Sequence, residues 1–171
     1  MRIFVAIKAD DNIRELALEI KKKVPVDVRW TPPENLHITL IPPWDEKEPN
    51  IQGVADKLEK ISAPNISLAF KKCSFGPSSR NPRLIWITAD SCEMLNGLKN
   101  DIERTLGFIV PERKFIPHIT IARFRAECFR DFPTKEFDLA IDQEMKISGF
   151  SLIRSILTSK GAVYSTIRDF T

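Results

Sequence analysis

The stretches "HITL" at residues 37–40 and "HITI" at residues 118–121 share almost the same four letters and contain the only two histidines of the chain. Threonine accounts for only 9 of the 171 residues, so chance poorly explains a threonine two places after each histidine. Alternate side chains of an extended strand share one face. His37 and Thr39 are therefore expected to point to one face and their aliphatic neighbours to the other, and the second stretch repeats this pattern.

The two motifs belong to a longer internal repeat. Shifting the chain by 81 residues without gaps brings Arg2 onto Arg83 and each residue of the first motif onto its equivalent in the second. Each half starts with a bulky apolar strand, continues with apolar residues at helical spacing, and ends in a histidine motif. The pattern predicts duplicated strand–helix–strand units at about 2–41 and 83–124, within a single domain that spans residues 1–171.

Local signals predict where these elements begin and end. The expected strands cover residues 2–8, 26–30, 36–41, 65–75, 83–88, 118–124, 136–141, 146–157 and 162–170, and residues 42–50 form a polar, proline-rich loop. Apolar residues at helical spacing predict three helices, over residues 13–24, 51–61 and 95–106. Asp11 or Asn12 is expected to cap the first helix, and Asp90 with Glu93 to form a capping box at the third. Gly107 is the expected C-cap of the third helix.

Bulk composition is that of an ordinary globular protein. Apolar residues make up 43% of the chain and charged residues 29%, and no apolar run is long enough to cross a membrane. The early acidic residues after the first strand argue against a signal peptide. The three cysteines, Cys73, Cys92 and Cys128, are widely spaced and are expected to be free thiols of a cytoplasmic protein.

Net charge favours anionic partners only mildly. The formal charge is +3, well below that expected of a protein that coats a nucleic-acid duplex. Part of the positive charge is local, because five basic residues flank the second motif: Arg113, Lys114, Arg123, Arg125 and Arg130.

A duplicated unit is expected to fold into two lobes related by an approximate two-fold axis. Equivalent strands then meet near the axis and bring His37 and His118 toward each other across a cleft. Such a pair can hold one neutral imidazole as base and one imidazolium as acid near neutral pH. In-line displacement at phosphorus needs both groups, and the hydroxyls of Thr39 and Thr120 are placed to donate to the phosphate oxygens.

Other readings of the two histidines fit the sequence less well. A zinc site needs three or four ligands, and neither motif contains a carboxylate or a cysteine. No nucleophile elbow, P-loop or dinucleotide-binding glycine motif is present. A lone histidine in such a strand is usually a half-buried structural residue, but two matched copies make that interpretation a weak one.

The paired motifs resemble the H-x-T-x signature of the two-histidine (2H) phosphoesterases. The stretch "PHITIAR" at 117–123 is similar to the branch known as RNA 2',3'-cyclic phosphodiesterase or 2'-5' RNA ligase. The opening "MRIFVAI", the "RW" before the first motif and the ending "GFSLIRSILTSKGAVYSTIRDF" extend the resemblance over nearly the whole chain. It implies a bilobal α+β fold with two antiparallel sheets facing a central cleft and helices on the outside.

The resemblance also implies roles for individual residues. His37 would be the proton donor to the leaving 3'-oxygen and His118 the proton acceptor that activates water, while Thr39 and Thr120 would bind the phosphate. Arg123 stands where the family motif continues with a phosphate-binding arginine. Strict alternation puts it on the face opposite His118, so it reaches the cleft only through a bulge or at the end of the strand, and is otherwise a surface arginine.

Two aromatic residues have open interpretations. Phe4 either stacks on a base or is a core phenylalanine, and Trp44 either contacts a base or caps the core. The branch often has a phenylalanine–leucine–glycine turn after the first motif, where this chain has "IPPWDEKEP" at 41–49. That departure concerns substrate preference and leaves the histidine pair untouched.

The activity that the resemblance implies is metal-independent hydrolysis of 2',3'-cyclic phosphates at RNA ends to 2'-phosphomonoesters, with reverse 2'-5' ligation as a second reaction. The alternatives are a phosphodiesterase for a small cyclic nucleotide-type ester, or a non-catalytic module that binds RNA ends. We expect no metal or other cofactor, no membrane partner and a monomer. The partners would be RNA ends or small nucleotides that carry a 2',3'-cyclic phosphate.

Overall fold

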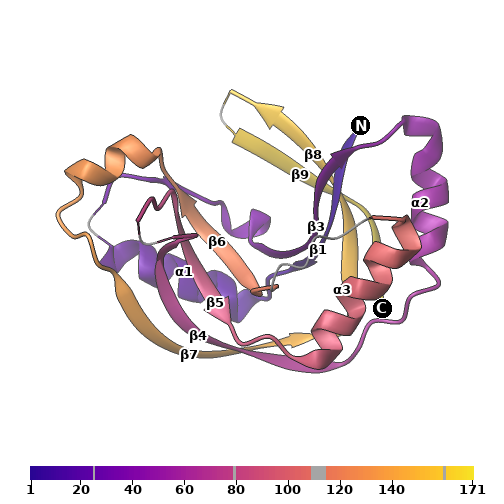
Figure 1. The fold of residues 1–171 in the computed structure, drawn as a ribbon, viewed down its shortest axis with the longest axis horizontal. Helices are drawn as coiled ribbons and strands as arrows, with labels where there is room; N and C mark the ends of the chain where they lie inside the picture. The colour runs from indigo at the N-terminus through magenta and orange to yellow at the C-terminus, as the bar shows by residue number, and fades with distance from the viewer. Residues whose placement is uncertain (25, 79, 109–114, 160) are drawn as a thin grey trace.

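The computed structural model describes residues 1–24, 26–78, 80–108, 115–159 and 161–171, and its chain folds into a curled sheet with three helices along its outer side (Figure 1). In chain order the elements are β1 (Arg2–Lys8), α1 (Asp11–Lys23), β2 (Arg29–Trp30), the 3-10 helix η1 (Pro33–Asn35), β3 (His37–Asp45), η2 (Glu48–Asn50), α2 (Ile51–Leu58), β4 (Ile66–Gly76), β5 (Leu84–Ala89), α3 (Glu93–Leu106), β6 (His118–Arg123), η3 (Ala126–Asp131), β7 (Asp138–Ile147), β8 (Phe150–Thr158) and β9 (Gly161–Phe170).

The strands form one antiparallel sheet with two halves. The order is β7-β4-β5-β6-β3-β1-β8-β9, and the short β2 pairs with β6. The halves meet between β3 and β6 at a single residue pair, Ile38 opposite Ile119. These two residues are 81 positions apart, so the approximate two-fold axis of the repeat passes between them. The two predicted sheets are thus the halves of one sheet, joined at the histidine motifs.

The helix of each repeated unit packs against the other half of the sheet. α1, which follows β1, contacts β7 and borders a pocket with Ile121 of β6, whereas α3, which follows β5, contacts β3 and α2. The crossing is visible in Figure 1, where α1 lies behind β5 and β6 and α3 lies beside β1 and β8. One continuous core joins both helices to both halves of the sheet. The two units are therefore interlocked.

The first helix begins one or two residues earlier than predicted, since the predicted cap was Asp11 or Asn12. Asp10 is its N-cap, and a carboxylate oxygen of Asp10 accepts a hydrogen bond from the backbone N–H of Ile13 at 2.9 Å. The capping box predicted for the third helix is absent, because Cys92 is its N-cap and no side chain bonds there. Gly107 ends that helix with φ 76, as predicted, since glycine adopts this left-handed conformation without strain.

The predicted loop at 42–50 is partly a strand. β3 continues to Asp45, where it pairs with Arg2, and Trp44 pairs with Ile3. This extension supplies hydrogen-bond partners to the backbone of the first half of β1, which would otherwise lose them on that side. Loop composition is a weaker constraint here than the length of the neighbouring strand.

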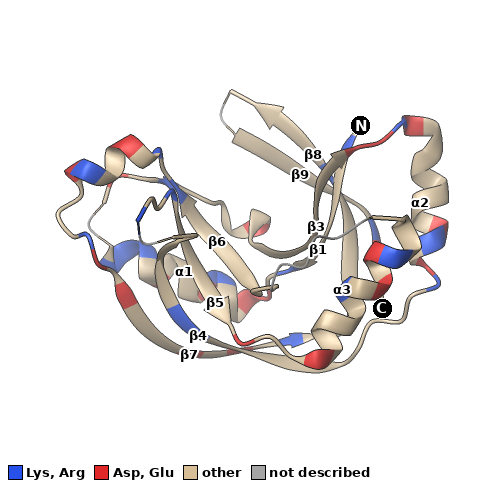
Figure 2. Ribbon diagram, viewed as in Figure 1, with Lys and Arg blue, Asp and Glu red and all other residues tan. Residues whose placement is uncertain are grey.

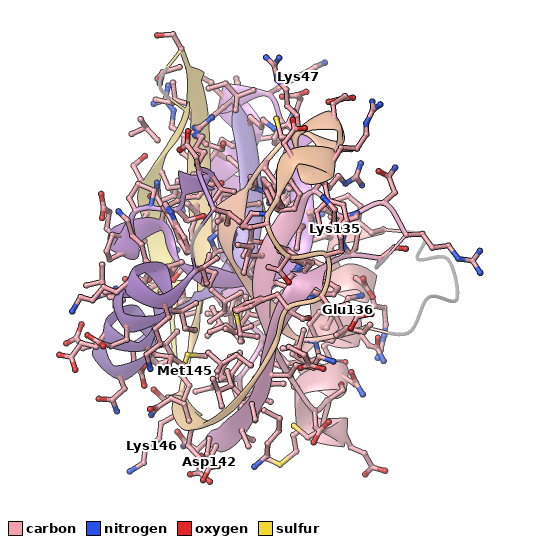
Figure 3. The ribbon with its side chains drawn as sticks, turned by 90° about the vertical axis from the view of Figure 1, so that its left-hand side faces the viewer. Lys47, Lys135, Glu136, Asp142, Met145 and Lys146 are labelled. Atoms are coloured by element: carbon pink, nitrogen blue, oxygen red, sulfur yellow. The ribbon has the colours of Figure 1, made fainter. Side chains whose placement is uncertain are left out.

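A phenylalanine cluster anchors the segment after β6. Five rings from β4, η3 and the loops around them have centroids between 4.9 and 6.2 Å apart in their contacting pairs: Phe75, Phe124, Phe129, Phe132 and Phe137. The ammonium of Lys135, labelled in Figure 3, donates to the carbonyls of Phe129 at 2.6 Å and Phe132 at 3.1 Å. The segment is thereby held against the end of β6.

No helix among the described residues is both long and apolar enough to cross a membrane.

Candidate active site

The two histidine motifs meet on one face of the sheet. The side chains of Ile38 and Ile119 are 0% exposed and belong to the main core. Because side chains alternate along a strand, the polar residues of both motifs point to the other side. We call that side the histidine face, and it carries the half-buried His37, Thr39, His118 and Thr120. The structure thus brings these four predicted residues together.

Both imidazoles are held by a backbone carbonyl two residues earlier in the chain. Nδ1 of His37 lies 2.6 Å from the carbonyl oxygen of Asn35, and Nδ1 of His118 lies 2.8 Å from that of Ile116. A carbonyl oxygen only accepts, so each Nδ1 carries a proton and donates it. Each ring therefore gains or loses its other proton at Nε2, the atom available for acid–base chemistry.

The surroundings lower the pKa of both histidines below the ordinary value. For His37 the main cause is desolvation by burial, opposed by the hydrogen bond to Asn35 and reinforced by the positive charges of Arg123 and His118. Desolvation also lowers the pKa of His118, opposed by the bond to Ile116 and reinforced by Arg123. A bound anion would raise both pKa values and allow one ring to keep a proton while the other is neutral.

Arg123 shares the electrostatic environment of the histidines because β6 contains a bulge. The β5–β6 register shifts by one residue at this point, and Ile121 and Ala122 are both buried in the core, at 1% and 0% exposure. Two consecutive core residues reverse the alternation, which turns the exposed Arg123 back to the side of His118. Of the two routes by which Arg123 could reach the cleft, the structure has the bulge, and the positive charge of Arg123 lowers the pKa of both rings.

An aromatic wall stands beside His37. The ring of Phe4 on β1 lies 5.0 Å from the imidazole, and the ring of Tyr164 on β9 lies 5.4 Å from it, edge-on. Phe4 is only 1% exposed and forms a small cluster with Ala6, Ile153 and Tyr164, separate from the main core. Phe4 therefore supports the imidazole and offers no open ring to a base.

Trp44 is not brought into the site. It packs against the main core on the opposite side of the sheet, with its ring 5.2 Å from that of Phe108. Its partner across β1 and β3 is Ile3, a core residue, and its indole N–H donates to Glu46 at 3.4 Å. Of its two open interpretations, the structure has the cap on the core.

A different aromatic residue lies beside His118. The indole of Trp86 on β5 is 4.9 Å from the imidazole, and its N–H donates to the hydroxyl of Ser74 at 3.2 Å. A Cβ at Gly76 would collide with this indole, so only glycine leaves room for it. Trp86 pairs with Thr120 across β5 and β6, which confirms that its side chain lies on the histidine face.

Sequence reasoning missed Trp86, Tyr164 and Asn35. A usable signal existed for Trp86. It lies two places before Thr88 and therefore shares a face with it, and Thr88 pairs with His118 of the second motif. Tyr164 and Asn35 carry no such signal, because their place depends on how the C-terminal strands pack against the first unit.

The charge beside the second motif is mixed. Arg113 and Lys114 lie outside the described residues, and Arg125 and Arg130 are exposed. Acidic residues alternate with basic ones along η3 (Figure 2). Among the residues of this group that the structure describes, Arg123 is the one whose charge lowers the pKa of both histidines.

The cysteines are free thiols, as predicted. Burial, with a smaller contribution from Asp138, raises the pKa of Cys73 to about 12, so this thiol is inert as a nucleophile. Within the parts of the chain that the structure describes, no three histidine, cysteine or acidic side chains gather as a set of metal ligands.

Solved structures share this architecture. The protein TT0787 of Thermus thermophilus superimposes with a TM-score of 0.79 at 24% identity, covering 99% of this chain and 97% of the other. E. coli LigT, crystallised with 3'-AMP, gives a TM-score of 0.78 at 21% identity, covering 99% and 96%. The fold is therefore that of the LigT-type α+β phosphoesterases.

Sequence comparison gives the family. The model described as "LigT like Phosphoesterase" matches the chain twice, over residues 5–86 and 87–164. The chain belongs to this family. It is 30% identical to an RNA 2',3'-cyclic phosphodiesterase of Archaeoglobus fulgidus, covering 99% of both chains, and 31% identical to one of Aquifex aeolicus, covering 99% of this chain and 96% of the other.

Proposed function

We propose that this protein hydrolyses 2',3'-cyclic phosphates at RNA ends to 2'-phosphomonoesters. The observation that carries the proposal is the meeting of two matching motifs at the Ile38–Ile119 pair, which puts two imidazoles and two threonine hydroxyls on one face. The relatives named as RNA 2',3'-cyclic phosphodiesterases support the same substrate class. The chain acts as a single domain of two interlocked units, as a monomer in the cytoplasm.

The reaction exchanges one bond at phosphorus for another. Nε2 of His118 takes a proton from water as the water oxygen attacks phosphorus. The bond from phosphorus to the 3'-oxygen breaks, and Nε2 of His37 gives its proton to that oxygen. The product keeps the phosphate on the 2'-oxygen, and the two histidines end with their protonation states exchanged.

The phosphate group gains negative charge as this step proceeds. The hydroxyls of Thr39 and Thr120 donate to its non-bridging oxygens, and the Arg123 guanidinium binds it by charge-assisted hydrogen bonds. The pair of histidines and these donors need no metal ion for the proton transfers. Attack by a 5'-hydroxyl in place of water is the reverse direction of cleavage of a 2'-5' linkage, so the same groups support 2'-5' ligation.

The direct test is a product analysis. Purified protein is incubated with a short RNA that ends in a 2',3'-cyclic phosphate, with EDTA present, and the position of the phosphate is read by 31P NMR. A 2'-phosphate is expected. A 3'-phosphate, or loss of activity with EDTA, contradicts the proposed step. Turnover of 2',3'-cyclic AMP without turnover of the RNA would transfer the proposal to a small-nucleotide substrate.

A further inference from the structure

The tip of the β8–β9 hairpin is attached to the segment just before the first histidine motif. The side-chain amide of Asn35 donates to the carbonyl of Ala162 at 3.3 Å. Beside it, the Arg29 guanidinium packs against Gly161, where φ is 131 and a Cβ would collide with that guanidinium. Figure 1 shows the hairpin extending past β1 and β3 toward the half of the sheet that contains β6.

The same hairpin forms one wall of the His37 environment. Tyr164 on β9 and Ile153 on β8 line a small pocket together with His37 and Asn35. The tyrosine ring packs on Phe4 at 4.9 Å and on the imidazole at 5.4 Å. A hairpin displaced at its tip would admit water to this pocket.

Asn35 thus contacts both the hairpin and the histidine. Its backbone carbonyl accepts the proton of His37 Nδ1 at 2.6 Å, while its side chain bonds the hairpin backbone. One residue therefore fixes the direction of the imidazole and the position of the wall that covers it.

Among the residues that the structure describes, no side chain attaches the second histidine motif in this way. The residue equivalent to Asn35, 81 positions later, is Ile116, whose carbonyl also accepts from its histidine. Its side chain is apolar and 45% exposed, so it makes no hydrogen bond to the strand pair β4–β7, which flanks β5 in the sheet as β8 and β9 flank β1. In both units the backbone carbonyl of this residue accepts a hydrogen bond from the histidine. Only in the first unit does its side chain also bond a neighbouring strand.

We propose that Asn35 is a positioning residue for His37, which it orients through its carbonyl and encloses by tying the β8–β9 hairpin in place. The proposal rests on the proposed function for the assignment of His37 as a reacting group. The hairpin thereby gives two otherwise equivalent histidines different environments, as a reaction with one acid and one base requires.

Charged and titratable groups reach His37 from several elements. Lys8 of β1 pairs with it across the strands and forms an ion pair with Asp169 of β9 at 2.8 Å. Glu34 of η1 and Tyr164 line the same pocket, and Arg123 and His118 of β6 act on the ring through their charge. Asn35→Leu changes the charge of none of these groups, and the ones that move with the hairpin are Tyr164 and Asp169 of β9, so a shift at His37 reports the hairpin.

The experiment uses Asn35→Leu, which keeps the approximate size and removes the donor, with Ile116→Ala as the matched control in the second unit. The chain has only two histidines, so both rings are followed by NMR titration and assigned with His37→Ala. Asn35→Leu is expected to raise the pKa of His37, because water relieves its desolvation, and to leave His118 unchanged. Ile116→Ala is expected to move neither ring.

Kinetics supply the second readout. Asn35→Leu is expected to lower kcat about fivefold, the change in an equilibrium that one net hydrogen bond produces, with little change in KM. Gly161→Ala, which displaces the tip from the hairpin side, is expected to move the pKa of His37 in the same direction.

The outcomes separate this proposal from the proposed function. Equal shifts of both histidines, or no shift at His37 in either Asn35→Leu or Gly161→Ala, overturn the positioning role. Absence of cyclic phosphodiesterase activity in the unmodified protein overturns the proposed function alone, since the titrations decide the positioning of His37 without any substrate.

Discussion

His37 and His118 have the same backbone contacts and differ in the side chains that surround them. Each ring donates to a carbonyl two residues earlier, and each motif is backed by a fully buried isoleucine. His37 is then enclosed by Phe4 and Tyr164, whereas His118 borders Trp86.

The difference continues beyond each motif. Five positions after His118 stands Arg123, whereas the equivalent position of the first unit is Pro42. Duplication supplies two like groups, and the surrounding chain makes them unlike. Proton transfer in one direction across a phosphate depends on that inequality.

The largest effect is expected from removing either imidazole. His37→Ala and His118→Ala should each lower kcat on 2',3'-cyclic AMP by about 10²–10⁴-fold, because each variant removes one positioned acid or base. The double variant should be hardly worse than either single one, since the two groups act in one step. Steady-state kinetics at several pH values measure this.

Lys146→Ala serves as the control for these variants. Lys146 lies near the C-terminal end of β7, at the bottom of Figure 3, and follows the buried Met145 in the chain. It should retain full activity and an unchanged melting temperature. Activity within twofold of the unmodified protein in either histidine variant would remove the acid–base assignment.

The second largest effect concerns the unequal position 123. Arg123→Gln should lower kcat/KM by about 10- to 100-fold, the contribution of a charge-assisted hydrogen bond. It should also raise the pKa of both histidines, because the arginine charge lowers both. NMR titration of the two rings checks this, with Arg125→Gln, an exposed neighbour, as the control. A shift in one ring only would show that Arg123 serves one half of the site.

A smaller effect tests whether the two motif threonines, Thr39 and Thr120, contribute equally. Thr39→Val and Thr120→Val keep the β-branched shape and remove one hydroxyl each. Each should lower kcat about tenfold, with folding intact by circular dichroism. A loss in only one of the two variants would mean that the phosphate sits closer to one motif, and the symmetric assignment would then fail.

The smallest effect is a dependence of stability on pH. Because the folded-state pKa of both histidines lies below the unfolded value of about 6.5, the unfolded chain binds more protons in that interval. The free energy of unfolding should therefore fall as the pH drops through 6.5 toward the folded-state values. Urea unfolding at pH 7.5 and 5.5 measures it. A His37→Gln variant should lose less stability on acidification than the unmodified protein, and an equal loss would argue against the depressed pKa.

The sequence was sufficient for the architecture and for the meeting of the two histidine motifs. The 81-residue repeat predicted the two units and the meeting of His37 with His118, because alternation and symmetry are properties of the pattern itself. The position of Arg123 needed one more fact, the bulge at Ile121, which the sequence allowed and did not require.

The walls of the site could not be predicted in the same way. The sequence placed Trp44 in a loop beside the site. In the structure β3 pairs with β1 as far as Asp45, so Trp44 belongs to β3. Tyr164 and Asn35 depend on the docking of the β8–β9 hairpin, which lies outside the two repeated segments of the sequence. Contacts between segments more than 120 residues apart, such as Asn35 with Ala162, leave no local trace in the sequence.

The crossed helices limit how such a molecule can be divided. Because α1 packs behind the strands of the second unit and α3 behind those of the first, a fragment holding one unit would expose the apolar side of its own helix and the back of its own strands. Two copies of one such fragment could cover each other by exchanging helices, and would carry two identical histidine motifs across a true dyad. In such a dimer any substitution would change both sites at once. In the single chain the residues around one motif can change without changing those around the other.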